Sequence, residues 1–195
     1  TTGEGGAITT NDEVLYQKLL MLRTHGITKS NMSENPGPWY YEMQELGFNY
    51  RLTDIQAVLG TSQLKKLDGF VRRRREIVAM YNNSFKDLDY CQIPLELPKL
   101  KSSFHLYVLK IDFKKIGLTR SEVMAKLKEK GIGTQVHYIP VHTQPYYKKR
   151  YGFKDGDYPI AEGYYQQALS LPLYPAMSDN DAQRVIDTIA QLLKP

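Results

Sequence analysis

The sequence has one cysteine, Cys91, among 195 residues, so it lacks both a disulfide framework and a cysteine-based metal site. A lone cysteine favours a reducing compartment, and we therefore expect a cytoplasmic protein. The sequence also lacks any run of about 18 apolar residues, the length that a membrane-spanning helix needs. We therefore expect neither a disulfide-stabilised protein nor a membrane partner.

Nucleic-acid-binding motifs are also lacking, although the net charge of +5 suggests an anionic partner such as nucleic acid, phosphate or a sugar nucleotide. The densest basic run is 72–75. Four consecutive residues of a helix point all round it, so we expect a solvated segment with ion pairs such as Arg72 to Glu76. We expect no nucleic-acid partner. A basic nucleic-acid-binding or regulatory module is the non-enzymatic alternative, and it predicts a steep salt dependence of binding.

The first part of the chain mixes strand and helix signals. We expect a strand at 7–10, then a helix that Asn11 caps and Gly26 ends. Residues 27–39 are polar and interrupted by proline, which indicates an exposed loop. Thr53 then begins a helix.

Apolar residues recur at helical spacing from Ile55 to Phe85. This stretch predicts a long helix, which Gly60 and Gly69 could bend. A helix of this length often joins two domains, and we place the boundary near Leu67. The sequence thus divides into 1–67 and 68–195.

The second part alternates strands and helices. We expect strands at 104–113, 133–138 and 169–173, and helices that begin near Thr119, Tyr146, Pro159 and Ser178. A short sheet with packed helices is an α/β layer domain, which is the fold class that we predict.

Glycines 3, 5 and 6 surround Glu4 at the start of the chain. Glycine permits a close approach of the backbone to a ligand, but it serves equally in a tight turn ahead of a strand. The spacing fits neither a dinucleotide-binding turn nor a phosphate-binding loop.

Asn49 and Arg51 lie just before the helix that begins at Thr53. Their N–H groups suit a phosphate, and the positive end of the helix dipole would assist. Alternatively, Asn49 adopts a left-handed turn conformation, and Arg51 pairs with Asp54 or Glu45.

The stretch 131–142 holds Gln135, His137, Tyr138 and His142 at a strand end. Such side chains bind hydroxyls and phosphates, and their rings can flank a sugar or a base. The two histidines lack a third ligand nearby, so we expect no metal. A packed, hydrogen-bonded histidine is the alternative interpretation.

Four segments together resemble the DegT/StrS-type sugar aminotransferases: TTGEGGAITTND from Thr1, LRTHG from Leu22, GFNYRLTDIQAVLG from Gly47 and GIGTQVHYIPVH from Gly131. This resemblance implies the fold type I of transferases that depend on pyridoxal 5'-phosphate. Residues 1–67 would be the C-terminal remnant of the large cofactor-binding domain with the start of a linking helix. Residues 68–195 would be the small domain.

The resemblance also implies roles for individual residues. Asn49 would bind the cofactor phosphate or the substrate of the neighbouring subunit in a homodimer with shared active sites. The segment of Gln135, Val136, His137 and Tyr138 would bind the nucleotide sugar, partly through its backbone. Arg51 would be a structural or phosphate partner.

The implied reaction moves an amino group from L-glutamate to C4 of a UDP-linked 4-keto-6-deoxy amino sugar, as in pseudaminic acid biosynthesis. The Schiff-base lysine of the family would precede Thr1, so we expect no catalytic residue in this chain and no activity of the chain by itself. A same-fold sugar dehydratase, with histidine in place of that lysine, is the alternative.

Overall fold

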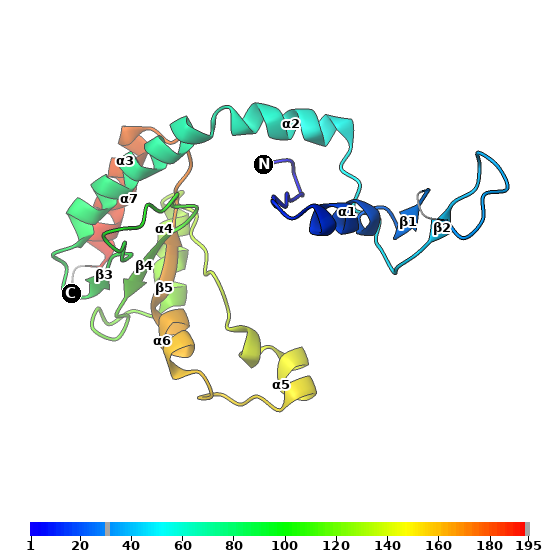
Figure 1. The fold of residues 1–195 in the computed structure, drawn as a ribbon. Coiled ribbons are helices and arrows are strands. Elements are labelled where there is room, and N and C mark those ends of the chain that lie inside the picture. Colours follow the sequence, from blue (N-terminus) through cyan, green and yellow to red (C-terminus); the bar gives the residue numbers. More distant parts are fainter. Residues whose placement is uncertain (30–31, 194–195) are drawn as a thin grey trace. The chain divides into compact units, whose positions relative to one another are not determined.

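A computed structural model describes residues 1–29 and 32–193 of the chain (Figure 1). The chain forms two compact units, unit 1 over Thr1–Leu67 and unit 2 over Asp68–Pro195, and each is described by itself. That the first is the end of a large cofactor-binding domain stays a prediction. Within the described ranges, no helix is both long enough and apolar enough to cross a membrane.

Unit 1 contains the helices α1 (Glu13–Leu22) and α2 (Asp54–Leu64). Between them, β1 (Ile27–Thr28) pairs antiparallel with β2 (Glu42–Met43). Neither helix buries a residue, and Gly26 is the one buried position among those described in this unit. Unit 1 is therefore held mainly by backbone hydrogen bonds and caps.

Two predictions for the start of unit 1 were wrong. Residues 7–10 form no strand, although they belong to the described range. The helix cap is Asp12 rather than Asn11, since the Oδ1 atom of Asp12 accepts a hydrogen bond of 3.1 Å from the backbone N–H of Leu15. An N-cap side chain lies two or three residues before the amide that it satisfies, and in sequence the neighbouring Asn11 and Asp12 suit that position equally.

The predicted loop at 27–39 begins with β1, so its first two residues are in a strand. The Glu42 carboxylate closes this loop, because it accepts hydrogen bonds from the backbone N–H of Ser33 at 2.8 Å and of Glu34 at 3.1 Å. The Ser33 hydroxyl donates to the same carboxylate. This bond first, and then the bonds from the backbone, lower the pKa of Glu42 to about 2. Ser30 and Asn31 lie outside the described residues.

The predicted long helix is two helices. α2 ends at Leu64 and α3 spans Leu67–Phe85, so the break falls at 65–66 and not at a glycine. Gly60 instead gives room to a neighbour, since a Cβ there would lie 3.2 Å from the Cγ2 atom of Thr2. The predicted start at Thr53 is confirmed by a capping box with Gln56.

The sheet of unit 2 has the order β3-β4-β5 and is antiparallel throughout (Figure 1). Its strands are β3 (Cys91–Gln92), β4 (Tyr107–Ile111) and β5 (Ala168–Leu171), of which β3 was not predicted. The predicted strand at 133–138 is reduced to one isolated bridge between Gln135 and Ser170. This bridge lies on the edge of β5 that does not pair with β4.

Helices α3, α4 (Arg120–Glu129) and α7 (Asp179–Leu192) supply apolar side chains to one core with the sheet. The Tyr81 and Tyr107 rings are fully buried in it, 4.9 Å apart. The Tyr81 hydroxyl donates to the Pro172 carbonyl at 2.8 Å, and the Tyr107 hydroxyl donates to the Asn82 side chain at 2.9 Å. Buried hydroxyls that find partners avoid a desolvation cost.

Three arginines of the basic run 72–75 make different contacts. Arg72 pairs with Glu76 at 3.9 Å, which confirms the expected ion pair. Arg73 donates to the Met177 carbonyl, and Arg75 forms a two-pronged pair with Glu96 at 2.7 and 2.9 Å. Arg73 and Arg75 thus join α3 to other segments of unit 2, whereas Arg72 pairs within the helix.

Candidate functional site

The glycine-rich start of the chain is attached to the first turn of α2. The Nε2 atom of Gln56 donates to the Glu4 carbonyl at 3.3 Å, and the same carbonyl accepts the Thr2 hydroxyl at 3.0 Å. Gly3 has a positive φ of 81°, which a residue with a side chain rarely adopts. This turn therefore lies over the helix start that Gln56 also caps.

Two of the matched sequence segments pair along their backbones. The N–H of His25 donates to the Phe48 carbonyl at 2.8 Å, and the N–H of Phe48 donates to the Leu22 carbonyl at 2.8 Å. Thr24 and Asn49 form an antiparallel bridge, which lies between the bond from His25 and a bond of 2.9 Å from the N–H of Tyr50 to the Arg23 carbonyl. The backbone of Asn49 is thereby fixed from both sides, only four residues before the cap of α2.

The Asn49 side chain is exposed and makes no hydrogen bond to any residue that the structure describes. Its backbone is not left-handed, so the alternative turn interpretation was wrong. Arg51 is also exposed and does not pair with Asp54 or Glu45, since Glu45 binds Lys18 at 3.2 Å. Unit 1 thus presents, beside a helix start, an amide and a guanidinium that have no partners within 1–29 and 32–193.

In unit 2, Gln135 and Ser170 exchange two backbone hydrogen bonds, of 2.8 and 3.2 Å. The Gln135 side chain turns back, and its Oε1 atom accepts from the N–H of Val136 at 2.9 Å. His137 is half-buried, and its Nδ1 atom lies 2.7 Å from the Ser170 hydroxyl. The Tyr138 ring meets the His137 ring edge-on, with centroids 4.6 Å apart.

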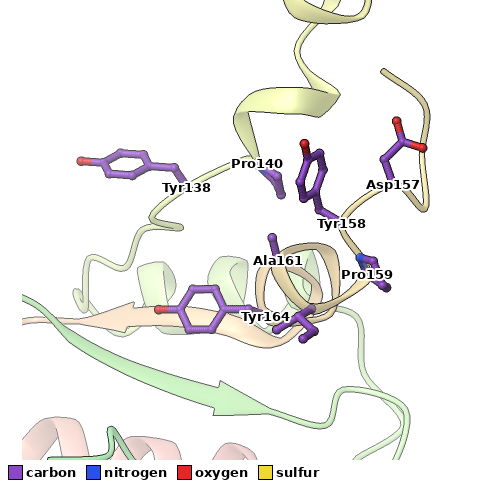
Figure 2. A pocket seen from close by; sticks show the side chains of 8 residues that line it. Tyr138, Pro140, Asp157, Tyr158, Pro159, Ala161 and Tyr164 are labelled. Carbon is purple, nitrogen blue, oxygen red and sulfur yellow. The ribbon is translucent and has the colours of Figure 1, made fainter. Parts of the chain in front are cut away.

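An open groove of about 620 Å³ includes Tyr138 in its lining (Figure 2). Its lining is mostly aromatic and apolar, with Tyr138, Pro140, Asp157, Tyr158, Pro159, Ile160, Ala161 and Tyr164. The Tyr138 and Tyr164 hydroxyls point to the same side in Figure 2. Tyrosine-lined grooves offer flat faces and polar tips, which suit a sugar or a base.

His142 serves a structural purpose. It is buried, and its Nε2 atom lies 2.8 Å from the Oε1 atom of Glu162. Glu162 also accepts from the N–H of Gly156 at 2.8 Å, and these bonds, that of His142 first, hold the pKa of Glu162 below its usual range. Within 1–29 and 32–193, no group of three or more His, Cys, Asp or Glu residues could hold a metal ion.

The role of Gln135, Val136, His137 and Tyr138 as ligand-binding residues stays a prediction, as does that of Asn49. Sequence reasoning missed Ser170 and Glu162. The sequence predicts a strand at Ser170 and a helix at Glu162, and no local signal marks either one as a site residue.

Comparison with known proteins gives the family. Over residues 1–190 the chain matches the DegT/DnrJ/EryC1/StrS aminotransferase family. It is 45% identical to the spore coat polysaccharide biosynthesis protein SpsC of Bacillus subtilis, over 99% of this chain and 50% of the relative. It is 37% identical to a UDP-4-amino-4,6-dideoxy-N-acetyl-beta-L-altrosamine transaminase of Campylobacter jejuni, over 100% of this chain and 49% of that protein.

Among solved structures, the chain resembles PseC of Helicobacter pylori, an aminotransferase involved in the biosynthesis of pseudoaminic acid. The TM-score is 0.86 at 32% identity, over 99% of this chain and 50% of that one. The chain spans about half the length of the curated relatives it matches. The likeness to aminotransferase structures confirms the predicted fold class, part of a fold type I transferase dependent on pyridoxal phosphate. The chain belongs to the DegT/DnrJ/EryC1/StrS aminotransferase family.

Proposed function

We propose that this chain is part of an aminotransferase that moves the amino group of L-glutamate to C4 of a UDP-linked 4-keto-6-deoxy amino sugar, as in pseudaminic acid biosynthesis. The observation that carries the proposal is the backbone pairing of 22–26 with 47–51, which presents the exposed Asn49 amide beside the start of α2. The relatives support the substrate class, since one is a transaminase named for a UDP-4-amino sugar.

The cofactor in this proposal is pyridoxal 5'-phosphate, and the residues of unit 1 fit its phosphate. Phosphate oxygens accept hydrogen bonds, and the exposed Asn49 amide and Arg51 guanidinium supply N–H donors without competing partners among the described residues. The nearby N-terminus of α2 adds a favourable dipole. We propose that Asn49 donates to the cofactor phosphate or to the substrate of the neighbouring subunit.

The bound cofactor supplies an electron sink for the carbon that gains or loses nitrogen. The residues of this chain bind and orient the partners of that reaction. In the proposal, backbone groups of 135–138 bind the nucleotide sugar, the outward nitrogen of His137 donates to one of its oxygens, and the Tyr138 ring flanks it. Holding ketone and amine in alignment lowers the entropic part of the barrier.

The activity is tested with a protein of the relatives' full length, L-glutamate and the UDP-linked 4-keto sugar. We expect 2-oxoglutarate and the 4-amino sugar in equal amounts, together with an absorbance change of the bound cofactor. Loss of a sugar hydroxyl without nitrogen transfer would indicate the dehydratase instead. The 195-residue chain by itself is expected to be inactive.

Two substitutions test the assigned residues in that protein. Asn49→Ala is expected to lower cofactor occupancy or raise the KM, whereas Asn83→Ala, at an exposed helix position, leaves both unchanged.

His137→Ala is expected to raise the KM for the sugar nucleotide more than that for glutamate. The exposed His105 provides the matched control. An equal effect of His137→Ala on both constants would mean that His137 is only structural.

We further propose a cytoplasmic homodimer with shared active sites that binds neither nucleic acid nor membranes. Sedimentation of the full-length protein would reveal the dimer. A monomer that retains full activity would contradict the proposed sharing of sites.

A further inference from the structure

Ser170 lies where it can control the orientation of His137. Ser170 is directly opposite Gln135 in the antiparallel bridge, and His137 is two residues further along the same segment. Residues two apart in an extended segment point to the same face, so the His137 ring reaches Ser170 diagonally. The result is the contact of 2.7 Å between Nδ1 and Oγ.

This contact is set in a rigid environment. Ser170 is only 4% exposed, and its own backbone is bonded to Gln135 on one side and lies in register with Val108 of β4 on the other. In the described part of the chain, the His137 ring is the one hydrogen-bond partner of the Ser170 hydroxyl. The His137 ring also contacts the Tyr138 ring, at an interplanar angle of 88°.

The two ring nitrogens of a neutral histidine differ, since one donates and the other accepts. With Nδ1 bound to Ser170, Nε2 is the nitrogen left for a ligand, and no described residue hydrogen-bonds to it. The oxygens of a diphosphate can only accept hydrogen bonds. A neutral His137 can bind them only when Nε2 carries the proton, which requires Nδ1 to accept from the serine hydroxyl.

We infer that Ser170 is a positioning residue that donates its hydroxyl proton to Nδ1 of His137 and so keeps the Nε2–H tautomer directed at an oxygen of the sugar nucleotide. The inference deepens the proposed function and rests on the role proposed there for His137. It assigns no contact between Ser170 and the substrate. Its first test therefore needs no substrate and no turnover.

The tautomer can be measured in the 195-residue chain by long-range proton–nitrogen NMR of the histidine side chains. The chain has 4 histidines, so His25, His105 and His142 serve as internal references. We expect His137 to be the Nε2–H tautomer at neutral pH, and Ser170→Ala to convert it to a mixture while the references stay unchanged. A His137 ring protonated on Nδ1, or a tautomer unaffected by Ser170→Ala, would overturn the inference.

The consequence for binding is tested in the full-length protein. Loss of an oriented donor is expected to raise the KM for the sugar nucleotide about 3- to 10-fold in Ser170→Ala, with kcat within about twofold and the KM for glutamate unchanged. Ser170→Thr keeps a hydroxyl and should restore both the tautomer and the KM. Ser84→Ala, which removes an exposed helix hydroxyl, is the control for serine replacement itself.

The kinetic outcomes separate the two proposals. A raised KM in His137→Ala with an unchanged KM in Ser170→Ala would overturn the positioning role and leave the proposed function standing. If neither substitution changes the KM, the substrate-binding role of His137 is wrong and the positioning of a substrate donor is overturned with it. The spectra would still show whether Ser170 sets the tautomer. Misfolding of Ser170→Ala would appear in its amide spectrum, and Ser170→Cys, of similar volume but weaker hydrogen bonding, then replaces it.

Discussion

Gly26 and Gly47 pack so closely that neither position has room for a side chain. A Cβ atom on Gly47 would collide with the backbone N of Gly26, and a Cβ atom on Gly26 would collide with the carbonyl of Glu45. Gly26 also has a positive φ of 68°. The contact brings together the matched segments that contain LRTHG and GFNYR, two residues before Asn49.

Gly47→Ala is therefore expected to loosen the pairing of these segments. The obstructing atoms belong to the backbone and cannot rotate away, so the cost should be about 1–3 kcal/mol. Hydrogen exchange at the amides of His25, Phe48 and Tyr50, all bonded across this pairing, measures it. Gly6→Ala is the matched control, because a Cβ there meets nothing within 4 Å. Equal exchange in both variants would contradict the prediction.

The sequence predicted best the features that depend on a few neighbouring residues. The caps at Thr53, Thr119 and Ser178 are confirmed, because a capping box is complete within four residues. Besides the cap at Asp12 and the helix break at 65–66, the wrong or missing predictions concern elements that depend on partners distant in sequence. The strand expected at 133–138 is a single bridge, and β3 forms only because Cys91 pairs with Ile111.

The same distinction applies to the candidate site. Gln135 and His137 were found because they share a segment with recognisable chemistry. Ser170 could not be found, since it meets His137 only through the register of an antiparallel bridge across 33 residues. The pairing of Gly26 with Gly47 could not be predicted from the sequence either, because each glycine by itself indicates only a turn.

The core of unit 2 should be sensitive to the loss of one buried hydroxyl. Tyr81→Phe removes the 2.8 Å hydrogen bond to the Pro172 carbonyl and leaves that acceptor unpaired. We expect the free energy of unfolding to fall by about 1–2 kcal/mol, measured by urea denaturation. Tyr146→Phe alters an exposed ring and should change it little. If the free energy of unfolding falls as little in Tyr81→Phe as in Tyr146→Phe, water replaces the missing hydroxyl as the donor to the Pro172 carbonyl.

The Arg75–Glu96 pair predicts how stability depends on pH. Hydrogen bonds from Arg75, and then from the N–H of Ser102, lower the pKa of Glu96 to about 2. The unfolded chain takes up this proton at a higher pH than the folded chain, so the stabilisation is complete above about pH 5 and is lost as the pH falls toward 2. Urea denaturation of Glu96→Gln should vary less over this window than that of the wild type. Glu129→Gln, which alters a carboxylate without an ion pair in the described chain, should retain the wild-type dependence.

Cys91 offers a direct readout of unfolding in unit 2. Burial raises the pKa of its thiol to about 12, so almost none is thiolate at pH 8 in the folded chain. Exposure on unfolding restores an ordinary thiol pKa of about 8.5, and its reaction with a disulfide reagent should accelerate by at least roughly 100-fold. With one cysteine in the sequence, the signal has a single origin. Rapid labelling without denaturant would show that β3 opens readily.

The two units should differ in resistance to proteases. Helices α1 and α2 bury no residue, and apolar side chains such as Val14, Ile55 and Val58 are 80%, 83% and 69% exposed. Short helices without buried contacts open easily, whereas α3 and α7 each bury several residues in the core. Limited proteolysis of the 195-residue chain, followed by mass spectrometry, should cut within 1–67 at least roughly tenfold faster than within the core helices and leave a piece that begins near Asp68. Equal cutting rates in both units would show that backbone hydrogen bonds alone hold unit 1 as firmly as the core holds unit 2.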